Sequence, residues 1–321
     1  MFLHASTFLL GKMIRTKINA PCNCDSVEVN RNLDKVFVGM YQYEESTLER
    51  GGGYLITTPE GVIEASGNHE YGCLDAKWID NERIVLACSD GVVRLLNTNG
   101  NIIQSSVDVV ENPSSTDTKN IIMTVDSVRD VTATITAKGK VSVIKNLELV
   151  ESAWQAHSDV MESWCCALNP TADLVASGSD DCCLKVWDTR SLALVHQDKR
   201  NHSMGVTCLE FVSDNIILTG SYDERIRKFD LRNPSVPLVE FRSIGGIWRL
   251  KPYEEYLLVA ACYGGCQVLV EAGDSFKPVV TEYRGHDSMA YGIASLGPGK
   301  AVSCSFYDKS VQFWSFDSLN S

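Results

Sequence analysis

The 321-residue sequence lacks most of the patterns that would identify a chemistry directly. It contains no GxSxG nucleophile elbow, no P-loop, no Rossmann glycine pattern and no HExxH motif. No apolar stretch approaches the ~20 residues that a membrane helix needs, and no long helical pattern occurs. The sequence therefore predicts neither membrane association nor a helical protein, and any catalytic residues must be gathered from distant parts of the chain.

Positive charge is also scarce. The chain has 29 Lys and Arg against 41 Asp and Glu, a formal charge of −12. Nucleic-acid binding depends on clustered basic residues, so the balance argues against a nucleic-acid partner. It suits a cationic ligand or partner, although an acidic surface serves solubility equally well.

The twelve cysteines do not have the spacing of a disulfide framework or a zinc site. Cys165 and Cys166 are adjacent, as are Cys182 and Cys183, and no two CxxC pairs occur. Buried thiols behave as small apolar side chains, and a reducing cytoplasmic location without a metal is the simplest interpretation. Residues 1–10 are mildly apolar but lack a basic start and a clear cleavage site, which predicts an extension rather than a signal peptide.

What the chain does contain is a repeat. VASGSDDCCLKVWDTR (175–190) and ILTGSYDERIRKFDLR (217–232) are two copies of one segment, with their aspartates Asp181 and Asp223 42 residues apart. Each aspartate is followed six residues later by an aromatic residue, and Asp308 repeats that spacing near the end of the chain. This period and strand–turn–strand texture resemble WD40 repeats, which implies an all-β, seven-bladed WD40 β-propeller.

The domain prediction is a single propeller over residues 25–321, preceded by an N-terminal extension, residues 1–24. Residues 12–20 are expected to add the outer strand of the last blade, because closure of the ring by both ends removes an exposed sheet edge. Glu44 to Gly53 reads as a turn-rich insert within the first blade, and residues 111–120 as a polar link. The predicted blades are 25–65, 71–104, a degenerate third ending at 144, 157–195, 202–239, 244–270 and 286–316.

Several polar residues fit a structural role common to WD40 blades, in which a histidine bonds the aspartate of a turn with help from a hydroxyl and a tryptophan. The fourth blade offers His157, Ser177, Asp181 and Trp187. An unpaired buried polar group costs about 1–3 kcal/mol, which is sufficient reason for such sets. The fifth blade offers His202, Thr219 and Asp223, with Phe229 in place of the tryptophan. The seventh offers His286 and Asp308, with Cys304 where the hydroxyl belongs.

Other side chains are not explained by the repeat. Positions before the turn aspartates and at the starts of the innermost strands are expected to surround the mouth of the central channel. Aromatic faces with acidic neighbours suit a quaternary ammonium group. Exposed rim aromatics equally mark a protein-binding face, and the residue types alone favour that second interpretation. The residues concerned are Glu162, Trp164, Asp180, Tyr222, Trp248, Tyr263, Tyr291 and Tyr307.

Beyond the repeat, the half of the chain after residue 153 carries strings that are not general WD40 consensus. They are AWQAH (153–157), KRNHSMGV (199–206), TGSYDE (219–224), GGIWR (245–249), LVAAC (258–262), SMAYG (288–292) and CSFYD (304–308). Together they resemble the WD-repeat diphthine methyl ester hydrolases of diphthamide biosynthesis. The resemblance implies an esterase, without a cofactor, that removes the ester methyl from methylated diphthine on elongation factor 2 before the final amidation.

The resemblance also guides the assignment of roles. A trimethylammonium beside a methyl ester would meet Trp248, Tyr222, Tyr291, Tyr307 and Tyr263. Ester hydrolysis further needs a base and a stabiliser of the oxyanion. The candidate bases are His202, oriented by Asp223, and the carboxylates Glu162 and Asp180. Arg249 or the amides of Gly245 and Gly246 would hold the oxyanion, and a Cys262 nucleophile is the alternative.

The expected partners are elongation factor 2 and other proteins of the same pathway, with the chain itself a monomer in the cytoplasm. The competing interpretation is a non-catalytic adaptor. WDTR and FDLR, which end in Arg190 and Arg232, also resemble the WDxR pattern that docks some propellers onto cullin-RING ligases.

Overall fold

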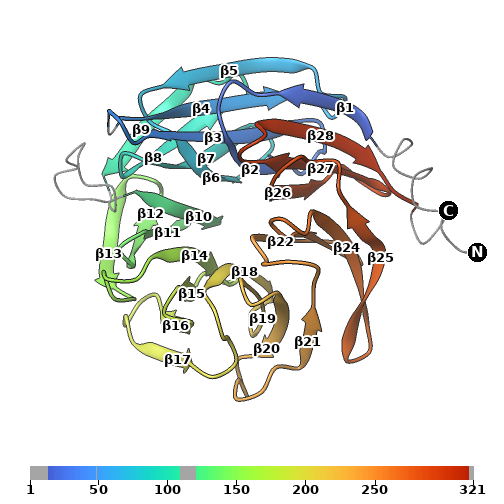
Figure 1. The fold of residues 1–321 in the computed structure, drawn as a ribbon. Coiled ribbons are helices and arrows are strands. Elements are labelled where there is room, and N and C mark those ends of the chain that lie inside the picture. Colours follow the sequence, from blue (N-terminus) through green and yellow to red (C-terminus); the bar gives the residue numbers. More distant parts are fainter. Residues whose placement is uncertain (1–13, 48, 109–120, 318–321) are drawn as a thin grey trace, which may run out of the picture.

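The computed structural model describes residues 14–47, 49–108 and 121–317. They form seven four-stranded antiparallel sheets arranged as a ring around a common axis (Figure 1), and the region along this axis is the channel of the propeller. The prediction of an all-β propeller with seven blades is confirmed. Residues 1–13 of the expected N-terminal extension and the expected link at 111–120 lie outside the described residues.

Each of the first four sheets uses four consecutive strands, from the channel outwards. The first sheet has β2 (Cys24–Val29), β3 (Val36–Glu44), β4 (Glu49–Thr57) and β5 (Ile63–His69). The second has β6 (Cys73–Trp78), β7 (Arg83–Cys88), β8 (Val92–Asn97) and β9 (Ile102–Asp108). The third has β10 (Ile122–Val128), β11 (Val131–Thr136), β12 (Lys140–Lys145) and β13 (Leu149–Gln155). The fourth has β14 (Ser163–Leu168), β15 (Leu174–Ser179), β16 (Leu184–Asp188) and β17 (Leu194–Asp198).

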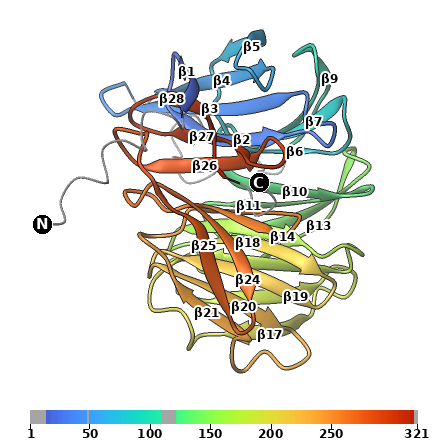
Figure 2. The same cartoon turned by 90° about the vertical axis from the view of Figure 1, so that its right-hand side faces the viewer.

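The remaining sheets complete the ring. The fifth has β18 (Val206–Ser213), β19 (Ile216–Ser221), β20 (Arg225–Asp230) and β21 (Val239–Arg242). The sixth has β22 (Arg249–Tyr253), β23 (Tyr256–Ala260), β24 (Cys266–Ala272) and β25 (Ser275–Tyr283), whose outer strand faces the viewer in Figure 2. The seventh has β26 (Ala290–Ser295), β27 (Lys300–Ser305) and β28 (Ser310–Ser315), and its outer strand is β1 (Ile14–Asn19).

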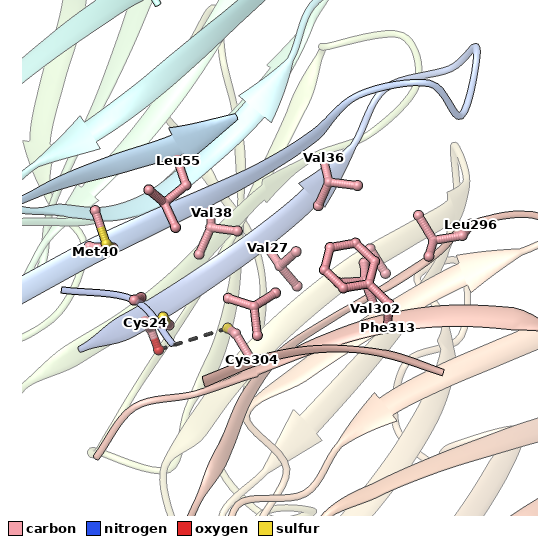
Figure 3. Packing of buried hydrophobic residues seen from close by; sticks show 13 residues of the cluster. Cys24, Val27, Val36, Val38, Met40, Leu55, Leu296, Val302, Cys304 and Phe313 are labelled. Atoms are coloured by element: carbon pink, nitrogen blue, oxygen red, sulfur yellow. Dashed lines mark hydrogen bonds between the residues drawn. The ribbon is translucent and has the colours of Figure 1, made fainter. Parts of the chain in front are cut away.

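The seam between the last and first blades is held by packed side chains. Val27 and Val36 of the first blade lie in one buried cluster with Val302 and Phe313 of the seventh (Figure 3). The thiol of Cys304 donates to the carbonyl oxygen of Cys24 across the seam, at 3.8 Å. The two ends of the chain are therefore joined through both an edge-strand pairing and a shared hydrophobic core.

The first blade differs from the sequence prediction. Residues 44 to 53 are not an insert between two strands, because β3 and β4 pair as far as Glu44 and Glu49 in one long hairpin. Gly52 lies within β4 with φ of +147°, and a Cβ there would stand 2.1 Å from the carbonyl oxygen of Met40. The glycines therefore allow two backbones to approach closely rather than making a turn.

All twelve cysteines are free thiols. Most are buried in strands, and burial raises the pKa values of Cys88, Cys208 and Cys266 to about 12. Across the described ranges no group of three or more His, Cys, Asp and Glu side chains could hold a metal ion. Those ranges also contain no helix with the length and apolar character needed to cross a membrane.

Candidate functional site

A cavity of about 260 Å³ opens at the end of the channel where the innermost strands begin. It is mainly apolar and aromatic, with two carboxylates and one arginine. Its lining residues are Asp25, Tyr41, Leu74, Ile121, Met123, Ala137, Glu162, Trp164, Thr207, Trp248, Arg249, Tyr291, Phe306 and Tyr307. All seven blades contribute to it.

Six of the lining side chains occupy the same position in their blades. Each is the second residue of an innermost strand, where the pairing with the next strand shifts register by one residue. A β-bulge of this kind re-aims a side chain, which explains why these residues leave the sheet and face the channel. They are Asp25, Leu74, Met123, Trp164, Thr207 and Tyr291. In the sixth blade Trp248 lies just before β22, with its amide bonded to Ala260 O at 2.8 Å.

The aromatic side chains form a continuous run along one side of the cavity. Trp248 stacks on Tyr291 with ring centroids 4.5 Å apart, and Trp164 meets Trp248 edge-on at 5.4 Å. Phe306 extends the run, at 5.0 Å from both Tyr291 and Tyr307. Burial raises the pKa of Tyr291 well above its usual range, so its phenol stays neutral. This surface offers several ring faces to one bound group.

The two carboxylates of the cavity differ in exposure. Glu162 is solvent-exposed and lies at the mouth, whereas Asp25 is only 8% exposed. Burial raises the pKa of Asp25 to about 7, with Arg249 opposing the shift and Asp75 adding to it. Near neutral pH the site can therefore hold a carboxyl group in either protonation state.

Asp180 does not line the cavity but supports it. Its Oδ1 accepts a hydrogen bond of 2.7 Å from the indole nitrogen of Trp164. That bond fixes the edge of the ring on which Trp248 packs. The geometry gives Asp180 a positioning contact rather than contact with a bound group.

Arg249 lines the cavity and also the narrow polar space beneath it. Its guanidinium forms an ion pair of 3.0 Å with Asp75. Burial lowers the pKa of Arg249, but Asp75 and Asp25 outweigh that effect and hold it above its usual range. The arginine is therefore a fixed positive charge beside Asp25.

The structure places His202 away from the cavity. Its Nε2 lies 2.9 Å from the hydroxyl of Thr219 and its Nδ1 lies 3.4 Å from Asp198. The expected pairing with Asp223 is wrong, because Asp223 is bound to Arg227 at 2.9 Å and accepts from the amide of Ser203. Arg227 has taken the place that the histidine occupies beside Asp181 in the fourth blade. Both nitrogens of His202 thus face groups inside the blade.

The other candidates for the reaction centre are also separate from the cavity. Burial raises the pKa of Cys262 to about 12, which disfavours its thiolate, and the residue does not line the cavity. Gly245 and Gly246 do not line it either. A Cβ on Gly246 would lie 2.8 Å from the Tyr222 ring, so this glycine serves close packing. Tyr222 and Tyr263 are exposed outside the cavity lining, at 40% and 66%.

The residues expected to be structural form closed hydrogen-bonded sets. In the fourth blade His157 lies 2.8 Å from Asp181 and 2.9 Å from Ser177, whose hydroxyl also accepts from Trp187. In the seventh blade Cys304 was expected at the position of the hydroxyl residue, and this prediction is wrong by one residue. Ser303 supplies the hydroxyl, 2.7 Å from His286, and accepts from Trp314.

The seventh set differs from the fourth in its aspartate. Asp308 lies 3.7 Å from His286 Nδ1, and Ser310 makes the shorter contact of 2.9 Å to the same nitrogen. Asp308 instead accepts the amides of Asp287 and Ser310. The two sets therefore perform the same task with different partners.

Sequence reasoning missed eight of the fourteen lining residues, including Asp25, Leu74, Met123 and Thr207. The sequence contains a signal that could have found these four. Trp164 and Tyr291 are expected at the starts of the innermost strands of their blades, and each blade has one equivalent position. Extending that position to every blade leads to the missed residues. The first three blades conceal this position, because they lack the full set of turn aspartate and following aromatic residue from which it is counted. Thr207 lies in the fifth blade, which has that set, and could have been found by the same count.

Fold and site together define a seven-bladed β-propeller with a cavity of about 260 Å³ at one end of its channel. The WD40 family, described as WD domain, G-beta repeat, matches residues 149–188 and 195–230. A chain in the crystal structure of a mitotic checkpoint complex has the same fold, with a TM-score of 0.76 over 99% of this chain and 96% of that one. Its sequence identity is 14%.

Sequence relatives are more informative about the particular protein. A diphthine methyltransferase homolog of Dictyostelium discoideum is 34% identical over 194 residues, which are 51% of this chain and 52% of the relative. Diphthine methyltransferase of Mus musculus is 39% identical over 46% of this chain and 32% of its own length. The chain thus spans about half of the first relative and about a third of the second. Diphthine methyltransferase of Saccharomyces cerevisiae is 25% identical over 94% of this chain and 96% of its own.

Proposed function

We propose that this protein is a carboxylic ester hydrolase that removes the methyl ester of methylated diphthine on elongation factor 2, releasing methanol and diphthine. The relatives carry diphthine in their names. The observation that carries the proposal is the aromatic cavity with a buried carboxyl group beside it.

The cavity matches the two ends of the proposed substrate. A trimethylammonium is attracted to aromatic faces, at about 0.5–2 kcal/mol for each good contact. Trp248 and Tyr307 supply such faces, and the exposed Glu162 adds a negative charge at the mouth. A neutral methyl ester fits the less exposed part of the cavity, near Asp25 and Arg249.

An incomplete ring of exposed apolar side chains borders the mouth from the fourth to the seventh blade, which suits a substrate carried on a protein. These residues lie in turns at the end of the ring where the innermost strands begin. They are Val160, Met161, Met204, Tyr222, Tyr263 and Tyr307. Exposed apolar groups gathered on one face favour docking of a partner. We therefore propose that elongation factor 2 docks on this face. We propose separately that the chain acts as a monomer in the cytoplasm.

The names of the relatives specify methyl transfer, and the direction of that transfer separates two activities. A hydrolase cleaves the ester with water and releases its methoxy group as methanol, whereas a synthetic methyltransferase adds a methyl group from a donor. The decisive experiment incubates methylated elongation factor 2 with the purified chain and follows the factor by mass spectrometry. Loss of one methylene with release of methanol supports the hydrolase. Gain of one methylene that depends on an added methyl donor contradicts it.

The same face also suits a non-catalytic adaptor, since docking alone needs only the exposed ring. An adaptor would bind the factor and leave its mass unchanged. Arg190 is exposed and Arg232 is paired with Asp230 at 2.6 Å on the surface. Loss of ligase co-purification after charge reversal at these two arginines, with no hydrolysis by the wild type, would favour a cullin-RING receptor.

A further inference from the structure

We infer that Asp25 is the catalytic base of this site, an assignment that rests on the proposed ester hydrolysis. Asp25 occupies the bulge of β2, so its side chain faces the cavity rather than the sheet. It is buried, and within the described residues its carboxyl group makes no hydrogen bond and no ion pair. A buried polar group without a partner costs free energy, and such groups occur where they meet a ligand.

The other candidate bases are excluded by position. Asp180 is engaged by the indole of Trp164, and His202 faces Thr219 and Asp198 inside its blade. Glu162 lines the cavity but is exposed to water at the mouth, where it suits the cation. Asp25 alone among these candidates combines access to the cavity with burial.

The surroundings of Asp25 tune it for proton transfer. Arg249 of β22 favours its ionised form, while Asp75 of β6 disfavours it. Tyr41 of β3 and Tyr291 of β26 line the same cavity and interact electrostatically with Asp25. Three buried cysteines also do so, namely Cys24, Cys73 and Cys304. Burial is the largest influence and raises the pKa to about 7. A base with a pKa near the working pH is the most effective for general catalysis.

The proposed step balances in atoms and charge. The Asp25 carboxylate takes a proton from a water molecule as the water oxygen attacks the ester carbonyl carbon. The carbonyl electrons move onto oxygen, near the fixed charge of Arg249. The carbon–methoxy bond then breaks and the leaving oxygen takes the proton from Asp25, giving methanol. The carboxylic acid product ionises to water, and Asp25 is again a carboxylate.

The test compares wild type, Asp25→Asn and Asp25→Glu with methylated elongation factor 2, following methanol release and, separately, binding. We expect wild-type kcat to rise with pH around a midpoint near 7. Asp25→Asn should lose about 10²- to 10⁴-fold in kcat while its Kd for the factor stays within about threefold. Asp25→Glu should keep part of the rate and the pH dependence. Asp126→Asn, which removes a carboxylate lying outside the cavity, is the matched control.

Each outcome separates the two proposals. A wild type that hydrolyses nothing overturns the proposed function, and with it this assignment. An active wild type with an Asp25→Asn variant of similar kcat overturns the assignment alone. If the asparagine variant does not fold, the wild-type profile decides, because a rate that is flat between about pH 6 and 8 contradicts a base with this pKa.

Discussion

Two buried polar groups of this propeller, His157 and Asp25, differ in whether they have hydrogen-bonding partners. Around His157, both ring nitrogens, the Ser177 hydroxyl and the Asp181 carboxylate have partners. In the channel, Asp25 is equally enclosed but has no hydrogen-bonding partner among the described residues. The first arrangement stabilises a blade, whereas the second keeps a reactive group available at the expense of stability. The comparison suggests that a carboxyl group that is unpaired and open to the cavity, rather than residue type, marks the site.

The largest expected effect concerns the stability cost of Asp25. Its pKa is raised to about 7 in the fold from 3.8, so the native state holds its proton more tightly than the unfolded chain. Stability is therefore lost as pH rises from about 4 to about 7. Asp25→Asn avoids that loss and should raise the free energy of unfolding by about 4 kcal/mol at pH 8.

Urea unfolding of wild type and Asp25→Asn at several pH values measures this difference. It should be near zero below pH 4, grow up to about pH 7 and stay constant above. An asparagine variant that is less stable than wild type at pH 8 would mean that the carboxylate is paired and that the contrast with His157 is false.

The second expected effect follows from breaking the hydrogen-bonded set of the fourth blade. His157→Ala leaves Asp181 and Ser177 buried without their partner and should lower the free energy of unfolding by about 2 kcal/mol. Denaturant titration measures it, with His196→Ala, a half-buried histidine of β17, as control. Equal stability of the two variants would remove the structural role of the set.

A third effect has the opposite pH dependence to that of Asp25. Burial alone would raise the pKa of Asp198, but hydrogen bonds from His202 and the Arg200 amide outweigh it and lower the pKa to about 2. The ionised aspartate therefore stabilises the fold above pH 4, and this contribution disappears as pH falls to about 2. Asp198→Asn should cost about 1–2 kcal/mol at neutral pH and almost nothing near pH 2, as measured by urea unfolding at both pH values.

The smallest expected effect tests the aromatic side of the cavity. Trp248→Ala removes the ring stacked on Tyr291 and should weaken binding of methylated elongation factor 2 by about 1 kcal/mol, or about fivefold in Kd. Calorimetric titration measures it, and Trp248→Phe should recover most of the loss. If the affinity of the alanine variant is unchanged, the aromatic side of the cavity does not bind the factor, and binding depends only on the exposed apolar side chains around the mouth.

The sequence predicted the seven-bladed fold well because the repeat has the spacing typical of propeller blades. The spacing of Asp181, Asp223 and Asp308 indicated blades, and the aromatic positions Trp164, Trp248 and Tyr291 line the cavity as expected. What sequence spacing could not show is which atoms meet between strands. Asp198 faces His202 from only four residues away, a separation that the repeat pattern does not use. Asp25 lies in a blade without the motif, so only the bulge in its strand reveals its direction.

The seam closed by β1 and β28 has a consequence for the order in which the protein assembles. Six sheets use strands that are neighbours in sequence and can form while the chain is still being synthesised, but the seventh must wait for the first and last strands to meet. Contacts between such distant segments form slowly. The innermost strands β2 and β26, which carry Asp25 and Tyr291, pack against each other across this seam. The cavity is therefore completed by the final step of folding, and a partly made chain would have blades but no finished site.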